Sequence, residues 1–389
     1  MKKIIVFLLS CAIFLPLFSF PAAGAVFDGE LQAAAAVLYE PETGTFLYEK
    51  EADLALPPAS VTKVMTILLI CEAIDSGKLS PDESVTVSEY ASSMGGSQVF
   101  LSPGEEMKVA ELLKCIVVAS ANDAAVAMAE HLAGSEDSFV AEMNRRAESL
   151  GMKNTHFENV TGLDDTVTNH VTSARDIALM SAELIVKHPK ILEYSGIWMD
   201  SIRGGSFTLT NTNRLIRFYP GATGLKTGST AKAKFCISAT AERNGLKLIA
   251  VIMAAPTRDI RNAEAKKLLD FGFANYEIYR AEGETIRGIP LTGGVTKSFS
   301  ASYPSFQRLV EKGKARAVRP ERETEESYAA PIAPGEIIGK VFYTLDGEKI
   351  GETDIKATDG AEKIGFWGVV RRVAQKIISF CPDISENNA

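Results

Sequence analysis

The stretch KFCISATAE at 234–242, the turn RNG at 243–245 and the stretch LKLIAVIMAA at 246–255 decide the fold. Two apolar runs that flank a turn containing glycine predict a β-hairpin. A second hairpin is predicted near the other end of this region, where AAAAVLYE at 33–40 and TFLYEK at 45–50 flank the turn PETG. The sequence therefore places strands on both sides of a long middle segment.

The middle segment is predicted to be helical. SVTKVMTILLICEAID at 60–75 is apolar on nearly every side, which is typical of a helix inside a core. EEMKVAELLKCIVVAS at 105–120 predicts a second helix, and NDAAVAMAEHL at 122–132 a third, whose first two residues offer N-cap side chains. RNAEAKKLLDFGFANYEIY at 261–279 predicts another helix. The expected fold class is α/β (α+β), an antiparallel sheet with helices packed on it.

After about Glu282 the composition changes to short strand-like runs between turns, at 288–301 and 335–355, which predict a small all-β domain. The heavily charged segment 311–331 between them is expected to be a solvated hairpin or loop rather than a binding patch. The predicted parts of the chain are a signal peptide at 1–25, a first domain at 26–278, the β-rich domain at 279–362 and a terminal helix at 363–381.

The first 25 residues, MKKIIVFLLSCAIFLPLFSFPAAGA, have the form of a secretory signal peptide. Two lysines precede an apolar run that prolines interrupt, and small residues follow, so we expect cleavage after Ala25. Cys11 does not close the apolar run, as the cysteine of a lipoprotein signal would. The mature chain is therefore expected outside the cytoplasm.

The terminal segment GFWGVVRRVAQKIISFC at 365–381 separates into two faces when it is wound as a helix. Phe366, Val369, Val370, Val373, Ile377 and Phe380 share one face, and Arg371, Arg372, Gln375 and Lys376 share the other. It is too short and too charged to span a bilayer, but it fits a helix that lies in the membrane interface. An amphipathic helix docked on the protein is the alternative; the terminal position favours the membrane.

The formal net charge is −8 and the body of the chain has no long basic stretch, so nucleic acid is not an expected partner. Cys71, Cys115 and Cys236 lie in apolar runs and are expected to be buried thiols. No CxxC or HExxH motif occurs and the four histidines are far apart, so we expect neither a metal nor another cofactor.

Three short motifs carry candidate chemistry. They are Ser60-Val61-Thr62-Lys63, Ser120-Ala121-Asn122 and Lys226-Thr227-Gly228. None is decisive alone, because Ser229 with Lys232 repeats the first pattern and Ser385-Glu386-Asn387 repeats the second. Their order and context provide the specificity.

Ser60 opens a predicted buried helix, so Lys63 returns to the same face one turn later. A serine hydroxyl needs a base to take its proton, and a lysine can do so only when its pKa falls toward neutrality. Burial and the positive end of a helix dipole both lower that pKa. The alternative is an N-cap serine and a surface lysine, but an all-apolar helix gives Lys63 no solvent-facing side.

The other two motifs suit the walls of a cleft. At a break between helices, Ser120 can relay a proton to a leaving amine, and Asn122 can hold Lys63 and a substrate amide; a helix cap is the alternative. Lys226 and Thr227, on a predicted edge strand, suit a carboxylate, and Gly228 lets a substrate backbone approach. A peptide could add to that edge; a plain turn before the strand is the alternative.

SxxK, an SxN-type triplet and KTG together are the signature of penicillin-binding proteins and class A β-lactamases. The chain resembles the low-molecular-mass D-alanyl-D-alanine carboxypeptidases, peptidase family S11. The likeness extends through PPASVTKVMT, GGSQVFLSPGEEM, ASANDAAVAMAEHLAG, MKNTHFENVTGLDD, GLKTGST and KKLLDFGF, nearly end to end in the first domain. The resemblance implies a β-lactamase/transpeptidase-like catalytic domain, followed by a β-rich domain and an amphipathic membrane anchor.

The resemblance also implies the site. Ser60 would be the acylated nucleophile, Lys63 its base, Ser120 and Asn122 the facing wall, Lys226 and Thr227 the carboxylate clamp, and the amides of Ser60 and Ser229 the oxyanion donors. The implied substrates are peptidoglycan stem peptides ending in D-Ala-D-Ala, and β-lactams would be covalent inhibitors. Thr161 stands where several relatives carry histidine, and AKAKFC at 231–236 departs from the usual glycine-tyrosine. The resemblance therefore implies no part in deacylation for residue 161.

Three alternatives remain open. A class A β-lactamase would need a deacylating glutamate in an ExxLN-like loop, and the sequence has none after the SxN motif. A D,D-transpeptidase or an endopeptidase of the same fold is the second alternative; the transpeptidase would pass the same acyl group to an amine instead of water. A catalytically silent cell-wall-binding protein would have no need of a nucleophile beside a buried amine.

Overall fold

The computed structural model describes residues 25–378. The predicted signal peptide lies outside these residues apart from Ala25, and Cys11, Phe380 and Cys381 also lie outside them.

A five-stranded antiparallel sheet in the order β2-β1-β9-β8-β7 forms the centre of the first domain. Its strands are β1 (Ala35–Glu40), β2 (Thr45–Lys50), β7 (Ala222–Thr230), β8 (Lys234–Arg243) and β9 (Leu246–Ala255). Both predicted hairpins are confirmed, and β1 and β9 pair to join them. The strand β7, which carries Lys226-Thr227-Gly228, is an edge strand as expected.

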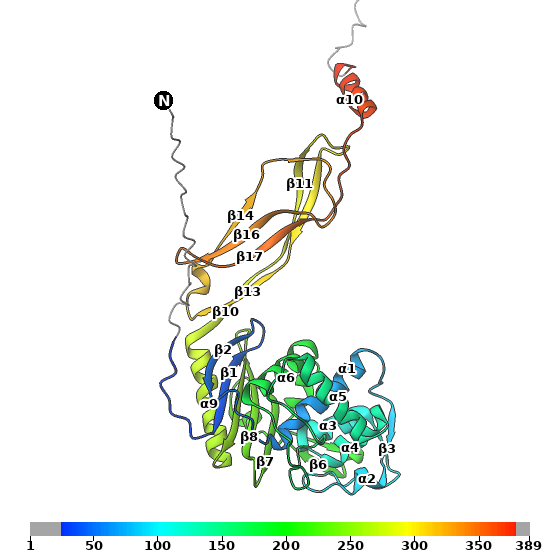
Figure 1. Cartoon of the computed structure of the whole chain (residues 1–389), viewed down its shortest axis with the longest axis vertical. Helices are drawn as coiled ribbons and strands as arrows, with labels where there is room; N and C mark the ends of the chain where they lie inside the picture. The colour runs from blue at the N-terminus through cyan, green and yellow to red at the C-terminus, as the bar shows by residue number, and fades with distance from the viewer. Residues whose placement is uncertain (1–24, 379–389) are drawn as a thin grey trace, which may run out of the picture.

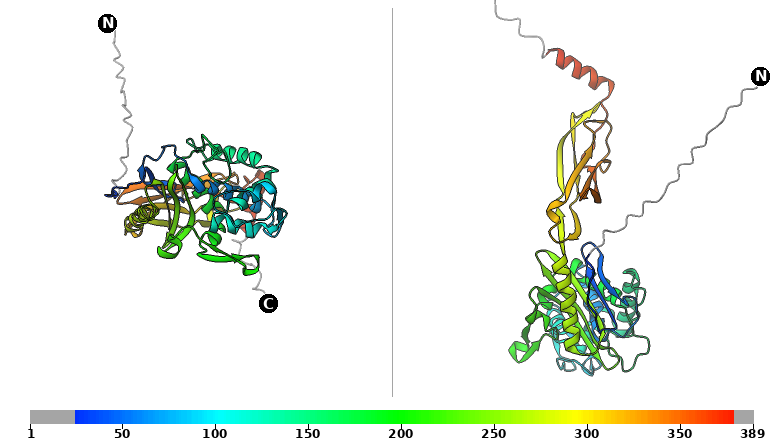
Figure 2. Two further views of the ribbon diagram at one scale, coloured as in Figure 1. Left: turned by 90° about the horizontal axis from the view of Figure 1, so that it is seen from below. Right: turned by 90° about the vertical axis from the view of Figure 1, so that its left-hand side faces the viewer.

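Helices cover both faces of this sheet (Figures 1 and 2). In β1, Val37 and Tyr39 pack against the face that most of the helices cover, whereas Ala36 and Leu38 face α9 (Arg258–Asn275) on the other side, as a period of two requires. The helices are α1 (Lys63–Asp75), α2 (Glu89–Ser92), α3 (Val109–Lys114), α4 (Asn122–Ala133), α5 (Glu136–Ser149), α6 (Ala174–Lys187), α7 (Ile191–Ser195), α8 (Leu215–Phe218) and α9 (Arg258–Asn275). The predicted sandwich of a sheet and helices is confirmed.

Two predicted helices are shorter than expected. The segment 105–120 begins as the strand β4 (Glu106–Lys108), which pairs with β3 (Ser84–Thr86), and it ends in a π-helical turn at Cys115–Ala119. Only the middle residue of β4 is buried, an alternation that suits a strand. The other segment, 261–279, leaves α9 after Asn275 and continues as β10 (Tyr276–Ala281), because that stretch pairs with the distant strand β13 (Phe306–Glu311).

The β-rich domain forms an arm that extends from the first domain (Figure 1). Its larger sheet has the order β14-β16-β17-β12-β11-β15. The strands are β11 (Glu284–Thr292), β12 (Ser298–Tyr303), β14 (Arg319–Thr324), β15 (Tyr328–Ala329), β16 (Ile337–Leu345) and β17 (Glu348–Ala357). The charged segment therefore contains a strand, β14, whose six residues are all exposed while its backbone pairs with β16.

The terminal helix α10 (Phe366–Ile378) follows the arm, and its described side chains are exposed. Its apolar residues include Phe366 and Trp367, which are 75% and 79% exposed. Arg372 bonds to the arm, donating to the carbonyls of Gly294 at 3.1 Å and Val295 at 2.8 Å. Within residues 25–378 no helix is long and apolar enough to cross a bilayer.

Candidate active site

Ser60 and Lys63 meet where a short 3-10 turn leads into α1. The turn covers Ala59–Thr62 and α1 begins at Lys63, so Ser60 precedes the α-helix instead of opening it. The Nζ atom of Lys63 lies 3.0 Å from the Oγ atom of Ser60. The expected pairing of a hydroxyl with an amine is therefore present in the geometry.

Two glycines allow other segments to approach this turn. A Cβ atom on Gly228 would lie 2.7 Å from the amide nitrogen of Ser60, and one on Gly162 would lie 1.9 Å from the carbonyl oxygen of Ala59. Gly162 also has a φ of +83°, which favours glycine. Gly228 is expected to let a substrate approach; the structure adds that it also lets β7 pack against the turn that carries Ser60.

Lys63 is completely buried, and three oxygen atoms surround its amine. Besides Ser60, it donates to Oδ1 of Asn122 at 2.5 Å and to the carbonyl of Thr161 at 2.9 Å. Burial, with a smaller contribution from the charge of Lys226, holds the pKa of Lys63 well below its usual value, while Asp123 raises it. A lysine with a lowered pKa can be neutral and can accept the proton of Ser60.

Ser120 lies at the predicted break between two helices, in a left-handed conformation with φ of 62°. The predicted N-cap at Asn122 and Asp123 is wrong: Ala121 is the N-cap residue, and no side chain caps α4. The Asn122 side chain is occupied by Lys63 and by the carbonyl of Gly95 at 2.7 Å. The backbone break therefore turns polar side chains toward the site instead of toward the helix end.

The Lys226-Thr227-Gly228 motif runs along β7 beside Ser120. Lys226 is 1% exposed, and its amine donates to Oγ of Ser120 and to the carbonyl of Thr227, both at 2.8 Å. Burial, with a contribution from Arg261, lowers the pKa of Lys226 to about 7. A second amine with a lowered pKa is thus linked by one hydroxyl to the cleft.

A cleft of about 620 Å³ opens over these residues. Its lining comprises Ser60, Ser97, Ser120, Trp198, Thr210, Asn211, Thr212, Arg214, Phe218, Thr227, Gly228, Ser229, Arg258 and Arg261. Three of these described residues are arginines and none is acidic, so the cleft suits an anionic ligand. Ser229 lines the cleft as well, whereas Lys63, Asn122 and Lys226 lie behind its surface.

Several groups of this site have no recognisable signal in the sequence. Thr161 contributes its backbone carbonyl to Lys63, while its hydroxyl bonds to Asn159. Arg261 is 3% exposed and lines the cleft from α9. A buried arginine in a helix of alternating charges has no local signature that distinguishes it from surface arginines. Among residues 25–378, no cluster of three or more His, Cys, Asp or Glu side chains could hold a metal ion.

We expect Lys226→Met to raise the thermal midpoint (Tm) at pH 6. The pKa of Lys226 is about 7 in the folded state, against 10.5 as the usual value. Below pH 7 the folded state carries the full cost of a buried ammonium, up to about 5 kcal/mol at about 1.4 kcal/mol per unit of pKa. This cost shrinks as the pH rises from 7 and vanishes above 10.5.

The stabilisation by Lys226→Met should therefore decline between pH 7 and pH 10, as measured by calorimetry on both proteins. The matched variant Lys234→Met changes an exposed lysine on β8 and should leave the Tm nearly unchanged. A Lys226→Met protein that melts below the wild type at pH 6 would show that the hydrogen bonds of Lys226 outweigh its desolvation.

Known proteins resemble this chain over most of its length. A sequence model described as D-alanyl-D-alanine carboxypeptidase matches residues 22–257, and one described as the C-terminal domain of penicillin-binding protein 5 matches residues 279–363. The D-alanyl-D-alanine carboxypeptidase DacF of Bacillus subtilis (strain 168) is 43% identical over 367 residues, which cover 90% of this chain and 93% of that protein.

Solved structures show the same similarity. Penicillin binding protein 5 from Haemophilus influenzae is 32% identical, has a TM-score of 0.75 and covers 87% of this chain and 100% of its own. Penicillin-binding protein D2 from Listeria monocytogenes in its ampicillin-bound form is 35% identical, with a TM-score of 0.58, and covers 62% of this chain and 98% of its own.

Proposed function

The chain belongs to the D-alanyl-D-alanine carboxypeptidase family of serine peptidases, the low-molecular-mass penicillin-binding proteins, and we propose that it removes the terminal D-alanine from peptidoglycan stem peptides. The observation that carries the proposal is the 3.0 Å contact between Ser60 and the buried amine of Lys63. Few other roles require a nucleophile beside an amine with a lowered pKa.

Acylation is the first step of the proposed reaction. Lys63 takes the proton of Ser60, and the Ser60 oxygen attacks the carbonyl carbon of the penultimate D-alanine. The backbone amides of Ser60 and Ser229 hold the oxyanion, since both residues line the cleft. One such donor typically contributes about 3 to 4 kcal/mol to the stability of the transition state.

The leaving D-alanine needs a proton on its amine as the peptide bond breaks. Ser120 supplies it and takes a replacement from Lys226, whose amine is 2.8 Å away and has a pKa of about 7. Thr227, together with the charges of Lys226 and the cleft arginines, attracts the terminal carboxylate of the substrate. Water then attacks the ester as its proton passes through Ser120 back to Lys226, and Lys63 returns its proton to Ser60 as the shortened stem peptide leaves.

Intact-mass spectrometry of the wild-type protein after benzylpenicillin, combined with D-alanine release from a D-Ala-D-Ala peptide, tests this function. A persistent adduct and release of D-alanine are expected. Transfer of the acyl group to an added D-amino acid in preference to water would make the protein a transpeptidase, and rapid turnover of the penicillin would make it a β-lactamase. If neither an adduct nor D-alanine release is found, a catalytically silent wall-binding protein is the remaining interpretation.

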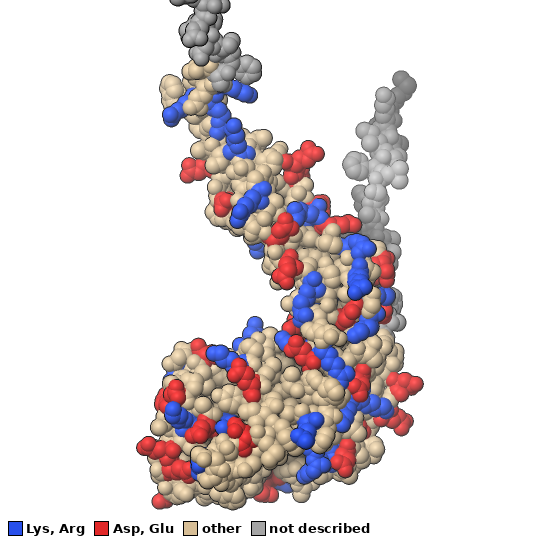
Figure 3. Space-filling model, turned by 180° about the vertical axis from the view of Figure 1, so that it is seen from behind, with Lys and Arg blue, Asp and Glu red and all other residues tan. Residues whose placement is uncertain are grey.

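The proposed site of action is the outer face of the cytoplasmic membrane, where peptidoglycan is the substrate. We place the catalytic domain at 26–278, the β-rich domain at 279–362 and a peripheral anchor at 363–381. The exposed apolar side of α10 supports the anchor, and so do the basic side chains on its other side (Figure 3). The bonds from Arg372 to the arm orient the helix, so the arm can act as a spacer.

We expect Val373→Asp to weaken binding to vesicles that contain anionic phosphatidylglycerol by about tenfold or more, because it places a carboxylate on the side of α10 that would be buried in the membrane. Val373 is 52% exposed in the structure and lies on the apolar side of α10. The matched variant Gln375→Asp places the same carboxylate on the polar side and should weaken binding less. Equal binding by wild type and Val373→Asp in a sedimentation assay would refute the anchor.

A further inference from the structure

A loop at residues 95–101 fixes the direction of the Asn122 side chain. The carbonyl of Ser97 accepts from the amide nitrogen of Asn122 at 2.7 Å, and the carbonyl of Gly95 accepts from Nδ2 of Asn122 at 2.7 Å. Because Nδ2 donates to the loop, Oδ1 is the atom that faces Lys63. The position of this loop therefore determines where the amine of Lys63 finds an acceptor.

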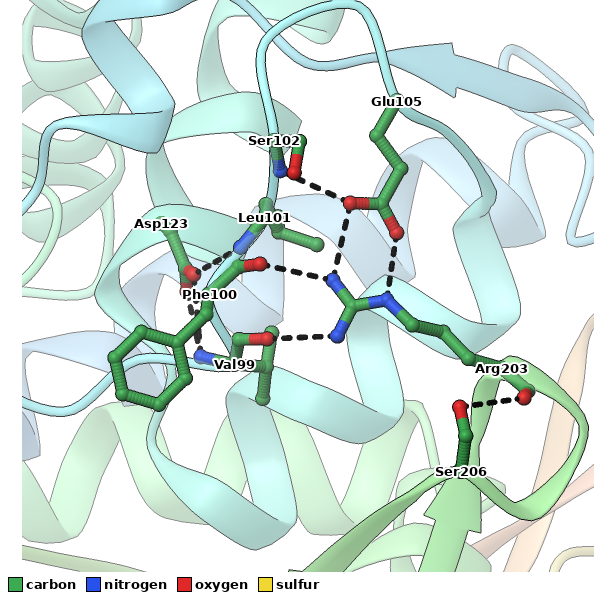
Figure 4. Close-up of polar contacts among 8 residues, drawn as sticks. All are labelled: Val99, Phe100, Leu101, Ser102, Glu105, Asp123, Arg203 and Ser206. Atoms are coloured by element: carbon green, nitrogen blue, oxygen red, sulfur yellow. Dashed lines mark hydrogen bonds and ion pairs between the residues drawn. The ribbon is translucent and has the colours of Figure 1, made fainter.

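The loop has no helix or strand of its own, and charged side chains hold its backbone from two sides (Figure 4). On one side, the buried carboxylate of Asp123 accepts from the amides of Val99 and Leu101, both at 3.1 Å. On the other, the guanidinium of Arg203 donates to the carbonyls of Val99 at 2.9 Å and Phe100 at 3.1 Å. These four bonds tie the loop to α4 and to Arg203.

Arg203 comes from the tip of a separate hairpin, formed by β5 (Met199–Ile202) and β6 (Phe207–Thr210). Glu105 orients its guanidinium with two bonds, from Nε at 2.7 Å and from Nη2 at 3.0 Å (Figure 4). The hydrogen bond from Arg203 holds the pKa of Glu105 below its usual value. Arg203 and Glu105 have only 25% and 22% of their side chains exposed, so solvent screens the pair little.

We propose that Arg203 is a positioning residue for acylation: by bonding to two carbonyls of the 95–101 loop, it keeps Asn122 directed at Lys63. Arg203 does not line the cleft, so it acts through the loop instead of touching the substrate. Only arginine can serve two carbonyls and both oxygens of a carboxylate at once, because its donors form a planar fork. The Arg203–Glu105 pair thus links the β5–β6 hairpin to Lys63, the proposed base, through the 95–101 loop and Asn122.

The test compares Arg203→Gln with Arg203→Lys and with Arg145→Gln. Arg145 is a matched control, since its side chain is 68% exposed and forms an ion pair with Glu142 of its own helix at 3.8 Å. We expect Arg203→Gln to lower the second-order rate constant for acylation by benzylpenicillin by up to about 10²-fold, the effect of a small misplacement. Arg203→Lys should recover part of the rate, and Arg145→Gln should match the wild type.

A cycle with Asn122→Ala separates positioning from a general loss of structure. If Arg203 acts through Asn122, adding Arg203→Gln to Asn122→Ala should slow acylation much less than it does in the wild type. Full additivity of the two effects would overturn the proposal, and so would a folded Arg203→Gln protein that is acylated at the wild-type rate. If Arg203→Gln does not fold, Glu105→Gln can replace it in the cycle with Asn122→Ala, and additivity of the two effects is judged in the same way.

This inference rests on the proposed acylation of Ser60, and the two can fail separately. A wild-type protein without a penicillin adduct would refute the proposed function. A wild-type adduct that forms as fast in Arg203→Gln would refute only the role of Arg203.

Discussion

Replacing Ser60 with alanine is expected to abolish the benzylpenicillin adduct and to lower kcat/KM for a D-Ala-D-Ala peptide by about 10⁶-fold, because the acyl-enzyme can no longer form. The hydroxyl of Ser60 lies 3.0 Å from the amine that would take its proton. Intact mass and D-alanine release measure the two effects, and Ser327→Ala, an exposed serine of the arm, serves as the control.

An adduct that persists in Ser60→Ala and maps to Ser229 would contradict this assignment. The sequence offers that possibility, since Ser229 and Lys232 also follow the SxxK pattern. In the structure the amine of Lys232 donates to the carbonyl of Asp164 at 2.5 Å. The second motif thus directs its lysine at a loop, whereas the first directs Lys63 at Ser60 from the start of a buried helix.

The sheet of the first domain could be predicted because its strands show their nature locally. The hairpin 234–255 and the hairpin 35–50 are apolar, flank turns and lie at the two ends of a helical segment. The edge position of β7 followed from its place before the 234–255 hairpin. In these segments local preference and tertiary contacts favour the same structure.

The strands that we assigned to helices or loops depend on distant partners. Residues 276–281 continue a helical pattern, but they pair with 306–311, about 30 residues further along the chain. Residues 319–324 carry charged side chains on both faces and become a strand because their backbone pairs with β16. Pairing of this kind depends on backbone groups, which every residue carries, so the sequence gives little sign of it.

In the candidate site, too, some groups could be predicted from local sequence and others only from the folded structure. Ser60, Lys63, Ser120, Asn122, Lys226 and Thr227 could be proposed from short motifs, and the structure brings them together. The carbonyls of Thr161 and Gly95 could not, because a backbone acceptor can belong to any residue type. Asp123 stood beside Asn122 in the sequence, yet only the folded loop reveals that its carboxylate binds Val99 and Leu101.

Replacing Lys63 with methionine is expected to slow acylation by benzylpenicillin by about 10²-fold to 10⁴-fold, the usual contribution of a general base. Methionine fills a similar volume without an amine, so Ser60 keeps its place but loses its proton acceptor. Stopped-flow or quenched mass measurements give the rate constant. The control is Lys232→Met, which removes the lysine of the other SxxK pattern and should acylate at nearly the wild-type rate.

The pH dependence of acylation distinguishes a base from a structural lysine. Only neutral Lys63 can take the proton, so the wild-type rate should rise with pH through the lowered pKa of Lys63. Burial lowers this pKa most, the charge of Lys226 lowers it further, and the charge of Asp123 raises it. Lys63→Met should lose this rise and remain slow at every pH. A variant that is slow but keeps the wild-type pH profile would show that another group is the base, with Lys226 as the first candidate because its pKa is about 7.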